Sequence, residues 1–363
     1  MAEMADILAA YGKEYIKQYQ DKLLPSHLQA IEAILQCRTQ DLGGHLFFCN
    51  SCQKEHYSYH SCKNRNCPKC QNETSYEWLR KQKAMLLPVT YFLVTFTIPQ
   101  PLRKLTRSNQ KILYNILFRT SAEALQTLAK DKKYLGGQIG MLGVLHTWTR
   151  QLHYHPHIHY VIPGCALLAN EDKFLFSKDK FLMPVKALSV IFRAKFRDAL
   201  REHPELFNTV EATTWKKCWV VHSKDVGSGE RVLEYMARYL NRIAISNHNI
   251  IKLENGKVTF RYKDAQTGKK SYQTISALEF IRRFLQHVLP KRFVKIRYYG
   301  WLSPANRDRL DQLRKQMMLP PSETVIEPPQ EKVKMQEREM YCPQCQALMI
   351  WKSIIPPKTR HPP

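Results

Sequence analysis

The cysteines between residues 37 and 70 are spaced like metal ligands. Cys49 and Cys52 form one pair with two residues between them, and Cys67 and Cys70 form a second pair after fourteen more residues. Two such pairs of thiolates suit the tetrahedral coordination of Zn²⁺. Six of the ten cysteines fall in this stretch, which favours metal binding in a reducing compartment over a disulfide scaffold. The sequence therefore predicts a structural zinc site made by Cys49, Cys52, Cys67 and Cys70.

Other thiols and imidazoles surround these pairs and extend to the C-terminus. A second, interleaved Cys2His2 zinc site is one interpretation of four of them; the alternative is surface histidines and small core cysteines. The four residues are Cys37, His45, His60 and Cys62. A last pair, Cys342 and Cys345, would need distant residues or a second chain to complete a site, and the alternative is an unligated exposed pair.

Histidines alternate with other residues where one apolar run begins. On a strand, His157 and His159 would point to the same face, because side chains alternate between faces. Two imidazoles can hold a divalent cation with open positions, whereas the alternative is an ordinary polar strand surface. As third ligand we favour His146, on the strand expected to pair with this one; Gln151 and His155 are nearer in sequence.

Two tyrosines lie one helical turn apart farther along the chain. Tyr235 and Tyr239 occupy positions i and i+4, which places their Cβ atoms within about 6 Å on a helix. A tyrosine pair at this spacing is common and usually indicates core packing. The tyrosine pair suggests a catalytic role because it occurs together with the paired histidines.

These motifs together resemble those of the HUH endonucleases, and more closely the two-tyrosine transposases of the insertion sequence ninety-one family. The likeness runs from about residue 30 to 302 and is carried by residues 43–45 with 59–70, 155–159 and 235–239. It implies rolling-circle transposition, in which Tyr235 and Tyr239 attack DNA phosphodiesters and leave a 5′-phosphotyrosine and a free 3′-OH. It also implies a catalytic Mg²⁺ or Mn²⁺ at the histidines and a five-stranded antiparallel sheet.

The charge of the chain favours nucleic acid as its partner. The 363 residues carry a formal net charge of +25, with an isoelectric point near 9.6. An anionic membrane surface is the runner-up, but no stretch approaches about 20 apolar residues and the N-terminus lacks a basic, apolar leader. We therefore expect a soluble protein of the bacterial cytoplasm or nucleoid, without a membrane partner. The sequence does not predict its oligomeric state.

Basic and aromatic residues alternate over residues 291–301, as expected for a surface that binds single-stranded DNA. The alternative is a solvated basic face with core aromatics. Predicted phosphate contacts in this segment and beside the tyrosines are Arg238, Arg242, Lys291, Arg292, Lys295 and Arg297.

Strand-like and helix-like segments alternate irregularly, which favours an α+β fold over a doubly wound sheet. We predict helices within 1–36, 76–86, 108–130, 187–202 and 229–242, and strands at 91–98, 141–148, 158–162 and 215–222. The predicted organisation is N-terminal helices (1–36), a zinc-binding domain (37–75), an HUH-type antiparallel-sheet catalytic domain (76–245), a basic DNA-binding extension (246–318), and a linker with the C-terminal cysteine pair (319–363).

Three functions remain open from these residues. A tyrosine transposase that nicks and transfers single strands at transposon ends uses every motif. A zinc-dependent, non-catalytic DNA-binding regulator leaves the histidines and tyrosines unexplained, and a metal-dependent hydrolytic nuclease leaves the tyrosines unexplained.

Overall fold

The structure is a computed structural model of the whole chain. It describes residues 2–70, 78, 82–83, 85–168, 173–178, 180–227, 231, 244–264, 267–319 and 339–358. Two compact units, each assembled from separated segments, make up the chain. The first unit contains residues 1–74, 245–288 and 326–363, and the second contains 75–244 and 289–325. The α+β class predicted from the sequence is confirmed. The predicted domains follow one another along the chain, whereas each compact unit combines segments that are separated in sequence.

A five-stranded antiparallel sheet forms the centre of the second unit. Its spatial order is β13-β5-β6-β3-β9, with bounds β3 Tyr91–Thr97, β5 Met141–Trp148, β6 Tyr154–Pro163, β9 Val221–Gly227 and β13 Ile296–Tyr299. The β-branched and aromatic run of β3 and the hairpin of β5 and β6 lie where the sequence predicts them. The strand predicted at 215–222 is displaced, because Ala212–Trp215 forms a 3-10 turn and pairing with β3 begins only at Val221.

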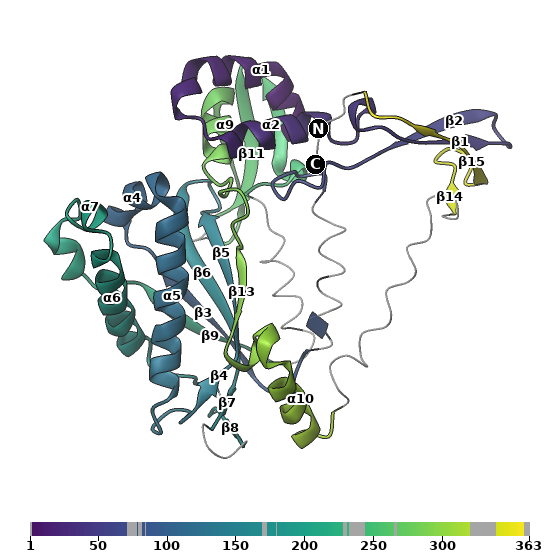
Figure 1. Cartoon of the computed structure of the whole chain (residues 1–363). Helices are drawn as coiled ribbons and strands as arrows, with labels where there is room; N and C mark the ends of the chain where they lie inside the picture. The colour runs from purple at the N-terminus through teal and green to yellow at the C-terminus, as the bar shows by residue number, and fades with distance from the viewer. Residues whose placement is uncertain are drawn as a thin grey trace. The chain divides into compact units, whose positions relative to one another are not determined.

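Helices α5 (Gln110–Ala129) and α6 (Val185–Arg201) cover one face of this sheet (Figure 1). The alternation of β3 and β6 turns Phe96 and Tyr160 toward them. The Phe96 ring lies edge-on to Phe192 of α6, with centroids 5.0 Å apart, and the Tyr160 hydroxyl lies 2.8 Å from Ser121 Oγ of α5. The opposite strand face, called here the histidine face, carries β3 residues 91, 93, 95 and 97 and β6 residues 157, 159 and 161.

Short elements complete the second unit. Strands β4, β7 and β8 form a small antiparallel sheet, and further helices precede α5, follow α6 and follow β13. Their bounds are α4 Arg103–Ser108, β4 Gln138–Ile139, β7 Cys165–Leu167, β8 Phe174–Phe176, α7 Pro204–Phe207 and α10 Arg307–Gln316.

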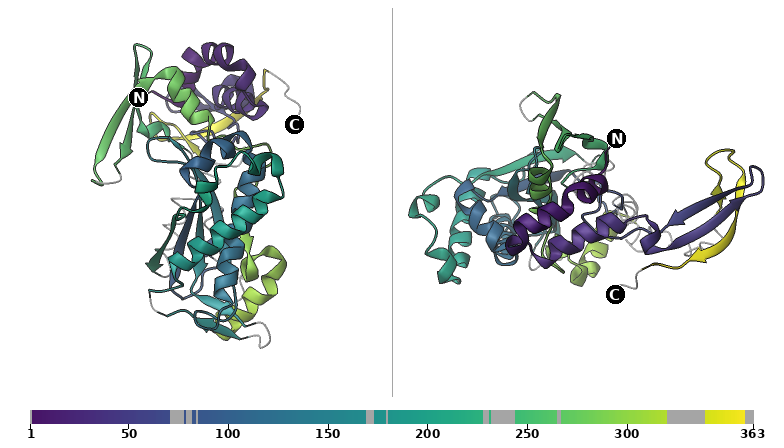
Figure 2. Two further views of the ribbon diagram at one scale, coloured as in Figure 1. Left: turned by 90° about the vertical axis from the view of Figure 1, so that its left-hand side faces the viewer. Right: turned by 90° about the horizontal axis from the view of Figure 1, so that it is seen from above.

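The first unit joins segments that are far apart in sequence. Helices α1 (Met4–Tyr19) and α2 (Pro25–Gln36) form the predicted N-terminal pair, with Pro25 opening α2. Helix α1 packs on α9 (Ala277–Leu285), which follows the antiparallel sheet of β10 (Ile250–Glu254), β11 (Lys257–Lys263) and β12 (Lys270–Ser276). Figure 2 shows these strands beside α9 and α1 from two further directions.

A second sheet of the first unit is built from both ends of the chain. Its order is β14-β15-β1-β2, with bounds β1 Gly44–Cys49, β2 Lys54–Tyr59, β14 Met340–Tyr341 and β15 Leu348–Ile355. Strand β15 pairs antiparallel with β1 from Gly44↔Ile355 to Phe48↔Ile350. In the described part of the chain, no helix is both long enough and apolar enough to cross a lipid bilayer.

Candidate metal centres

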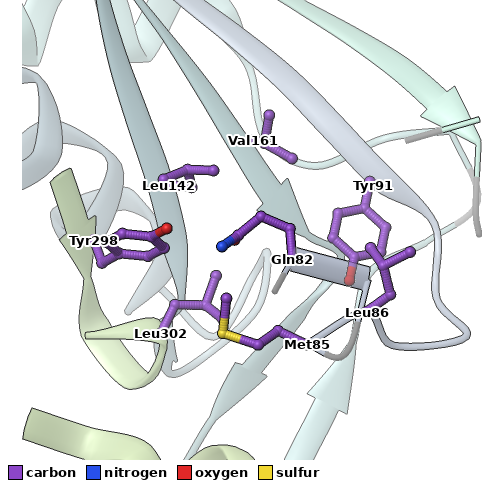
Figure 3. Close-up of a pocket in the computed structure, with 8 residues that line it drawn as sticks. All are labelled: Gln82, Met85, Leu86, Tyr91, Leu142, Val161, Tyr298 and Leu302. Atoms are coloured by element: carbon purple, nitrogen blue, oxygen red, sulfur yellow. The ribbon is translucent and has the colours of Figure 1, made fainter. Parts of the chain in front are cut away.

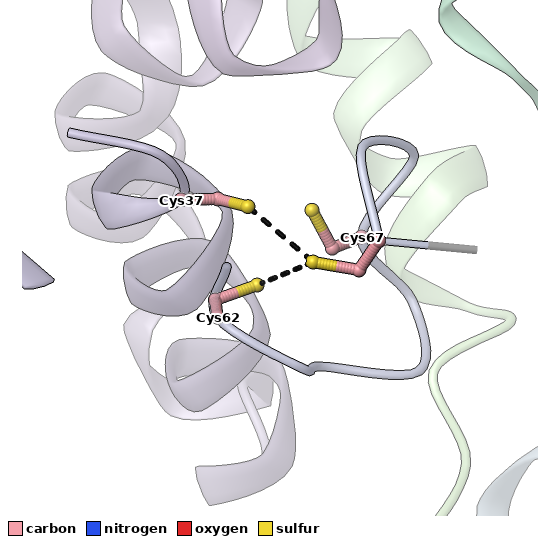
Figure 4. A group of neighbouring side chains, drawn as sticks. Cys37, Cys62 and Cys67 are labelled. Carbon is pink, nitrogen blue, oxygen red and sulfur yellow. Dashed lines mark hydrogen bonds between the residues drawn. The ribbon is translucent and has the colours of Figure 1, made fainter. Parts of the chain in front are cut away.

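The first cysteine cluster consists of Cys37, Cys62, Cys67 and Cys70 and is called the Cys37 cluster. Cys37 ends α2, Cys62 follows β2, and the other two lie on a tight turn in which the Cys70 N–H donates to the Cys67 carbonyl at 3.2 Å. The Cys70 sulfur lies 3.4 Å from that of Cys37 and 3.5 Å from that of Cys62. Figure 4 shows Cys37, Cys62 and Cys67 turned toward one another.

The second cluster, called the Cys342 cluster, joins two turns from opposite ends of the chain. Cys49 and Cys52 lie at the turn between β1 and β2, and Cys342 and Cys345 at the turn between β14 and β15. Sulfur atoms are 3.4 Å apart between Cys49 and Cys345 and 3.6 Å apart between Cys52 and Cys342.

Both clusters fit a tetrahedral zinc ion. In each, all four sulfur atoms lie within 4.8 Å of one another. Zinc–sulfur bonds of about 2.3 Å place tetrahedral sulfur ligands about 3.8 Å apart, so only small shifts separate these sulfurs from a closed structural site. An all-thiolate donor set of this kind excludes water and leaves no open position for catalysis.

Without a cation, neighbouring thiols in each cluster have pKa values shifted in opposite directions. Hydrogen bonding from Cys62 lowers the pKa of Cys37, and the same contact raises the pKa of Cys62. In the Cys342 cluster, the backbone N–H of Cys345 lowers the pKa of Cys342 to about 6, while its contact with Cys342 raises the pKa of Cys52 to about 12. One thiol in each cluster is thus favoured as thiolate while a neighbour is held protonated. A divalent cation would stabilise all of them as thiolates.

The predicted zinc ligand set of Cys49, Cys52, Cys67 and Cys70 is therefore wrong, because the two pairs belong to different clusters. Strand β2 separates them: its six residues extend about 17 Å, so the turn that begins it and the segment that follows it lie at opposite ends. Each pair completes its site with cysteines from elsewhere, Cys37 and Cys62 in one case and the C-terminal pair in the other.

The predicted second zinc set of Cys37, His45, His60 and Cys62 is also wrong in its histidines. The rings of His45 and His60 meet edge-on with centroids 5.1 Å apart, in neither cysteine cluster. Trp351 donates its indole N–H to His45 Nδ1 at 3.3 Å, which ties the ring to β15. Burial, with the adjacent His45, lowers the pKa of His60. These two rings therefore contribute to packing between β1 and its neighbours.

Three histidines converge on the histidine face of the five-stranded sheet. His146 of β5 lies directly across from His157 of β6, and His159 lies two residues farther along β6. Their ring centroids are 4.8–5.5 Å apart, and each offers a nitrogen within 4.8 Å of the others. His146 is 2% exposed and stacks on Trp148. The structure thus brings together the three histidines proposed as ligands, with open positions available on a cation that they would bind.

Two hydrogen bonds orient the β6 imidazoles. His157 Nδ1 lies 2.6 Å from the carbonyl oxygen of His155, and His159 Nδ1 lies 2.9 Å from the hydroxyl of Thr95 on the neighbouring strand β3. With Nδ1 occupied, Nε2 is the nitrogen left for a metal in each ring. From its sequence context, Thr95 is expected in the central sheet beside the site as a strand former, and not as a residue that positions His159. The feature that reveals this role is the strand register, Thr95↔His159, which is known only once β3 and β6 are paired.

The surroundings favour the neutral form of His157 and of its neighbour His155. Burial lowers the pKa of His157 to about 4, and the positive charge of Arg103 acts in the same direction. The pKa of His155 is likewise lowered to about 4, by burial and then by His157 and Arg103. A neutral imidazole is the form that binds metal, so His157 is available as a ligand near neutral pH.

An apolar pocket lies farther along the histidine face. It is lined by Tyr91, Leu142, Val161, Tyr298 and Leu302 from the sheet and its margin, and by Gln82, Met85 and Leu86 (Figure 3). The Tyr91 hydroxyl is bonded to the Leu87 N–H at 2.9 Å. The described residues that line the pocket include no charged side chain, so we assign it to packing of this face rather than to the histidine site.

The predicted DNA-binding residues have varied surroundings. Lys291 and Arg292 are exposed and Lys295 is half-buried. Arg297 is fixed within the unit, because its guanidinium lies 4.2 Å from the Phe118 ring centroid and donates to Asn115. The predicted helix at 229–242 falls, apart from residue 231, outside the described residues, as do Tyr235, Arg238, Tyr239 and Arg242; the predicted helix at 76–86 is described only in part.

Comparison with known proteins decides the family. A family model described as "Putative transposase" matches residues 140–309, and one described as "Transposase zinc-binding domain" matches residues 7–98. "Putative transposase y4qJ" of Sinorhizobium fredii (strain NBRC 101917 / NGR234) is 38% identical over 326 residues, which cover 85% of this chain and 82% of that protein. The chain belongs to the insertion sequence ninety-one family of transposases.

A second relative extends the likeness within this transposase family. "Transposase for insertion sequence element IS801" of Pseudomonas savastanoi pv. phaseolicola is 28% identical over 300 residues, or 77% of this chain and 70% of that protein. No solved structure is significantly similar to the chain. The transposase acts on DNA and carries a zinc-binding domain.

Proposed function

We propose that this transposase nicks and transfers single DNA strands at transposon ends through 5′-phosphotyrosine intermediates, in the manner of HUH enzymes. The observation that carries the proposal is the convergence of His146, His157 and His159 from two paired strands, in a chain of this transposase family. A regulator that only binds DNA has no use for three imidazoles that converge on one point.

The histidines supply a preorganised ligand set. Thr95 and the His155 carbonyl fix the β6 rings through Nδ1, so that neither ring needs to reorient when a cation binds. A Mg²⁺ or Mn²⁺ ion held there would polarise the scissile phosphate and offset its charge. Arg103, whose charge acts on both His155 and His157, adds positive potential beside the same point.

Tyr235 and Tyr239 are the proposed nucleophiles. The phenol oxygen of one tyrosine loses its proton and attacks the phosphorus, the bond from phosphorus to the 3′ oxygen breaks, and the departing 3′ oxygen takes up a proton. The phosphodiester energy is kept in the tyrosine ester, so a 3′-OH can later attack it and rejoin a strand. Two tyrosines allow two strands to be held in turn.

The proposed structural zinc ions have a different role. The Cys37 cluster ties α2 to the segment after β2, and the Cys342 cluster ties the C-terminal hairpin to β1 and β2. We assign both to shaping a DNA-recognition surface in the first unit, since all-cysteine sites leave no position for substrate. Cytoplasmic localisation follows from the same proposal, because the DNA substrate lies there.

The test uses single-stranded oligonucleotides from the element's own ends, labelled at either the 5′ or the 3′ terminus, with and without Mg²⁺. A metal-dependent covalent adduct that carries the 3′-side fragment is expected, and it should be lost in the Tyr235→Phe, Tyr239→Phe double variant. Cleavage without an adduct would support the hydrolytic nuclease. Tight binding of end sequences without cleavage would support the zinc-dependent regulator.

A further inference from the structure

The β10–β12 sheet of the first unit has one buried face and one exposed face. Val258 and Phe260 of β11 are fully buried, and the Phe260 ring packs on Phe280 of α9 with centroids 5.6 Å apart. Because side chains alternate along a strand, the intervening residues of β11 and their partners on β12 point away from α9. This exposed side is called here the outer face.

The outer face is strongly basic. Five basic residues lie on it, against one acidic residue, Glu254, which pairs with one of the five, Lys252, at 2.7 Å. The basic residues are Lys252, Lys257, Arg261, Lys263 and Lys270. Lys263 stands directly across from Lys270 in the β11–β12 register, so like charges adjoin at the end of the hairpin.

Hydroxyl groups lie between these charges. Thr259 and Thr274 form a cross-strand pair with oxygens 2.9 Å apart, and Arg261 lies directly across from Tyr272. Hydroxyls, lysines and arginines are the groups that proteins use to contact DNA phosphates. Successive outward residues on a strand are about 6.7 Å apart, and seven-residue β11 extends about 20 Å, so the outer face can follow a length of nucleic-acid backbone.

We infer that the outer face of the β10–β12 sheet is a docking surface for duplex DNA, separate from the histidine site. The inference extends the proposed function, because it gives the transposase a place to hold the double-stranded DNA flanking the strand that it nicks. The charge of the face favours a duplex, whose phosphates are denser than those of a single strand. A platform for single strands would present several stacked aromatics. The outer face carries one exposed aromatic, Tyr272, at 59% exposure.

The test measures binding of the full-length, zinc-loaded protein to a fluorescein-labelled duplex, and to one of its strands alone, at increasing NaCl. The variant is Lys257→Ala, Lys263→Ala, Lys270→Ala, all exposed positions. Each lost phosphate contact lowers the slope of log affinity against log salt by about 0.9. We therefore expect the slope for the duplex to fall by about 2.7 and the affinity by about 100-fold at physiological salt.

A matched control removes three exposed lysines of the second unit: Lys132→Ala, Lys133→Ala and Lys216→Ala. It should bind the duplex within a few-fold of the unchanged protein, since these lysines are not on the outer face. Unchanged zinc content and circular dichroism in both variants would show that folding is retained. Equal losses in the two variants would overturn the inference, because the effect would then be one of net charge alone.

Two further outcomes would also overturn it. Unaltered duplex affinity and salt slope in the outer-face variant would show that duplex DNA does not bind there. A loss confined to the single strand, reproduced by Tyr272→Ala, would show a single-strand platform instead. The proposed nicking reaction is read separately: if the unchanged protein binds duplex through this face but forms no tyrosine adduct, the proposed function fails and the inference stands.

Discussion

The C-terminal cysteine pair offers the sharpest test of how the zinc sites are partitioned. Replacing Cys342 and Cys345 by alanine removes two of the four sulfurs of the Cys342 cluster and leaves the Cys37 cluster intact. If each cluster binds one zinc, the purified protein should hold two equivalents, and this variant one. The ligand set first predicted from the sequence would leave the zinc content of the variant unchanged.

The structural consequence of losing this zinc should be local and large. Strand β15 is held to β1 by its ladder and by a small core of Phe47, Cys49, Cys342 and Met349. Structural zinc supplies about 10–16 kcal/mol in zinc-finger peptides, which matches or exceeds the whole stability of a typical domain. A core of four residues cannot replace it, so residues 339–358 should become accessible to protease.

The assay is zinc analysis by mass spectrometry together with limited proteolysis. Adding Cys49→Ala and Cys52→Ala to the variant should remove no further zinc, because all four residues serve one ion. Cys218→Ala, at an exposed cysteine outside both clusters, is the control and should keep two equivalents. Two equivalents in the Cys342, Cys345 variant, or none in the fourfold variant, would refute the partition.

Three further predictions concern the histidine site, the packing of the second unit and the metal. Thr95→Val removes the hydrogen bond to His159 and should weaken Mn²⁺-dependent DNA cleavage about 10- to 100-fold, whereas Thr97→Val, on the same strand face, should not. Gly140→Ala would place its Cβ 2.6 Å from the buried Trp301 ring, so urea unfolding should show a loss of about 1–3 kcal/mol; an unchanged midpoint would contradict this packing. Zinc chelation should abolish the thermal transition of the first unit and leave that of the second, because the four-cysteine clusters of the described residues all lie in the first.

Local patterns predicted the elements well. The alternating and β-branched runs at 91–98 and 141–148 became β3 and β5, and the break near Pro25 separates α1 from α2. The pairing of β5 with β6 was predicted because the two strands form a local hairpin. In the structure, their register places His146 across from His157. These features depend on residues close in sequence, which is why they could be predicted.

The zinc partition depends on long-range pairing and could not be predicted in the same way. Two CxxC pairs fourteen residues apart have the sequence spacing of a zinc site, but β2 extends between them and holds them apart in space. Two of the three partners of Cys49 lie almost 300 residues later, at the turn between β14 and β15, and nothing local in the sequence indicates this pairing. The place of β13 also depends on long-range pairing, since it forms the edge strand of the five-stranded sheet beside β5.

The central claim is tested most directly by identifying the amino acid that becomes linked to DNA. The protein would be incubated with a single-stranded end oligonucleotide and Mg²⁺, digested with nuclease and trypsin, and analysed by mass spectrometry. Trypsin separates the two tyrosines, since Tyr235 falls in the peptide of residues 232–238 and Tyr239 in that of residues 239–242. We predict a nucleotide adduct on one or both peptides, lost in His157→Ala. DNA cleavage with both peptides unmodified would contradict the account.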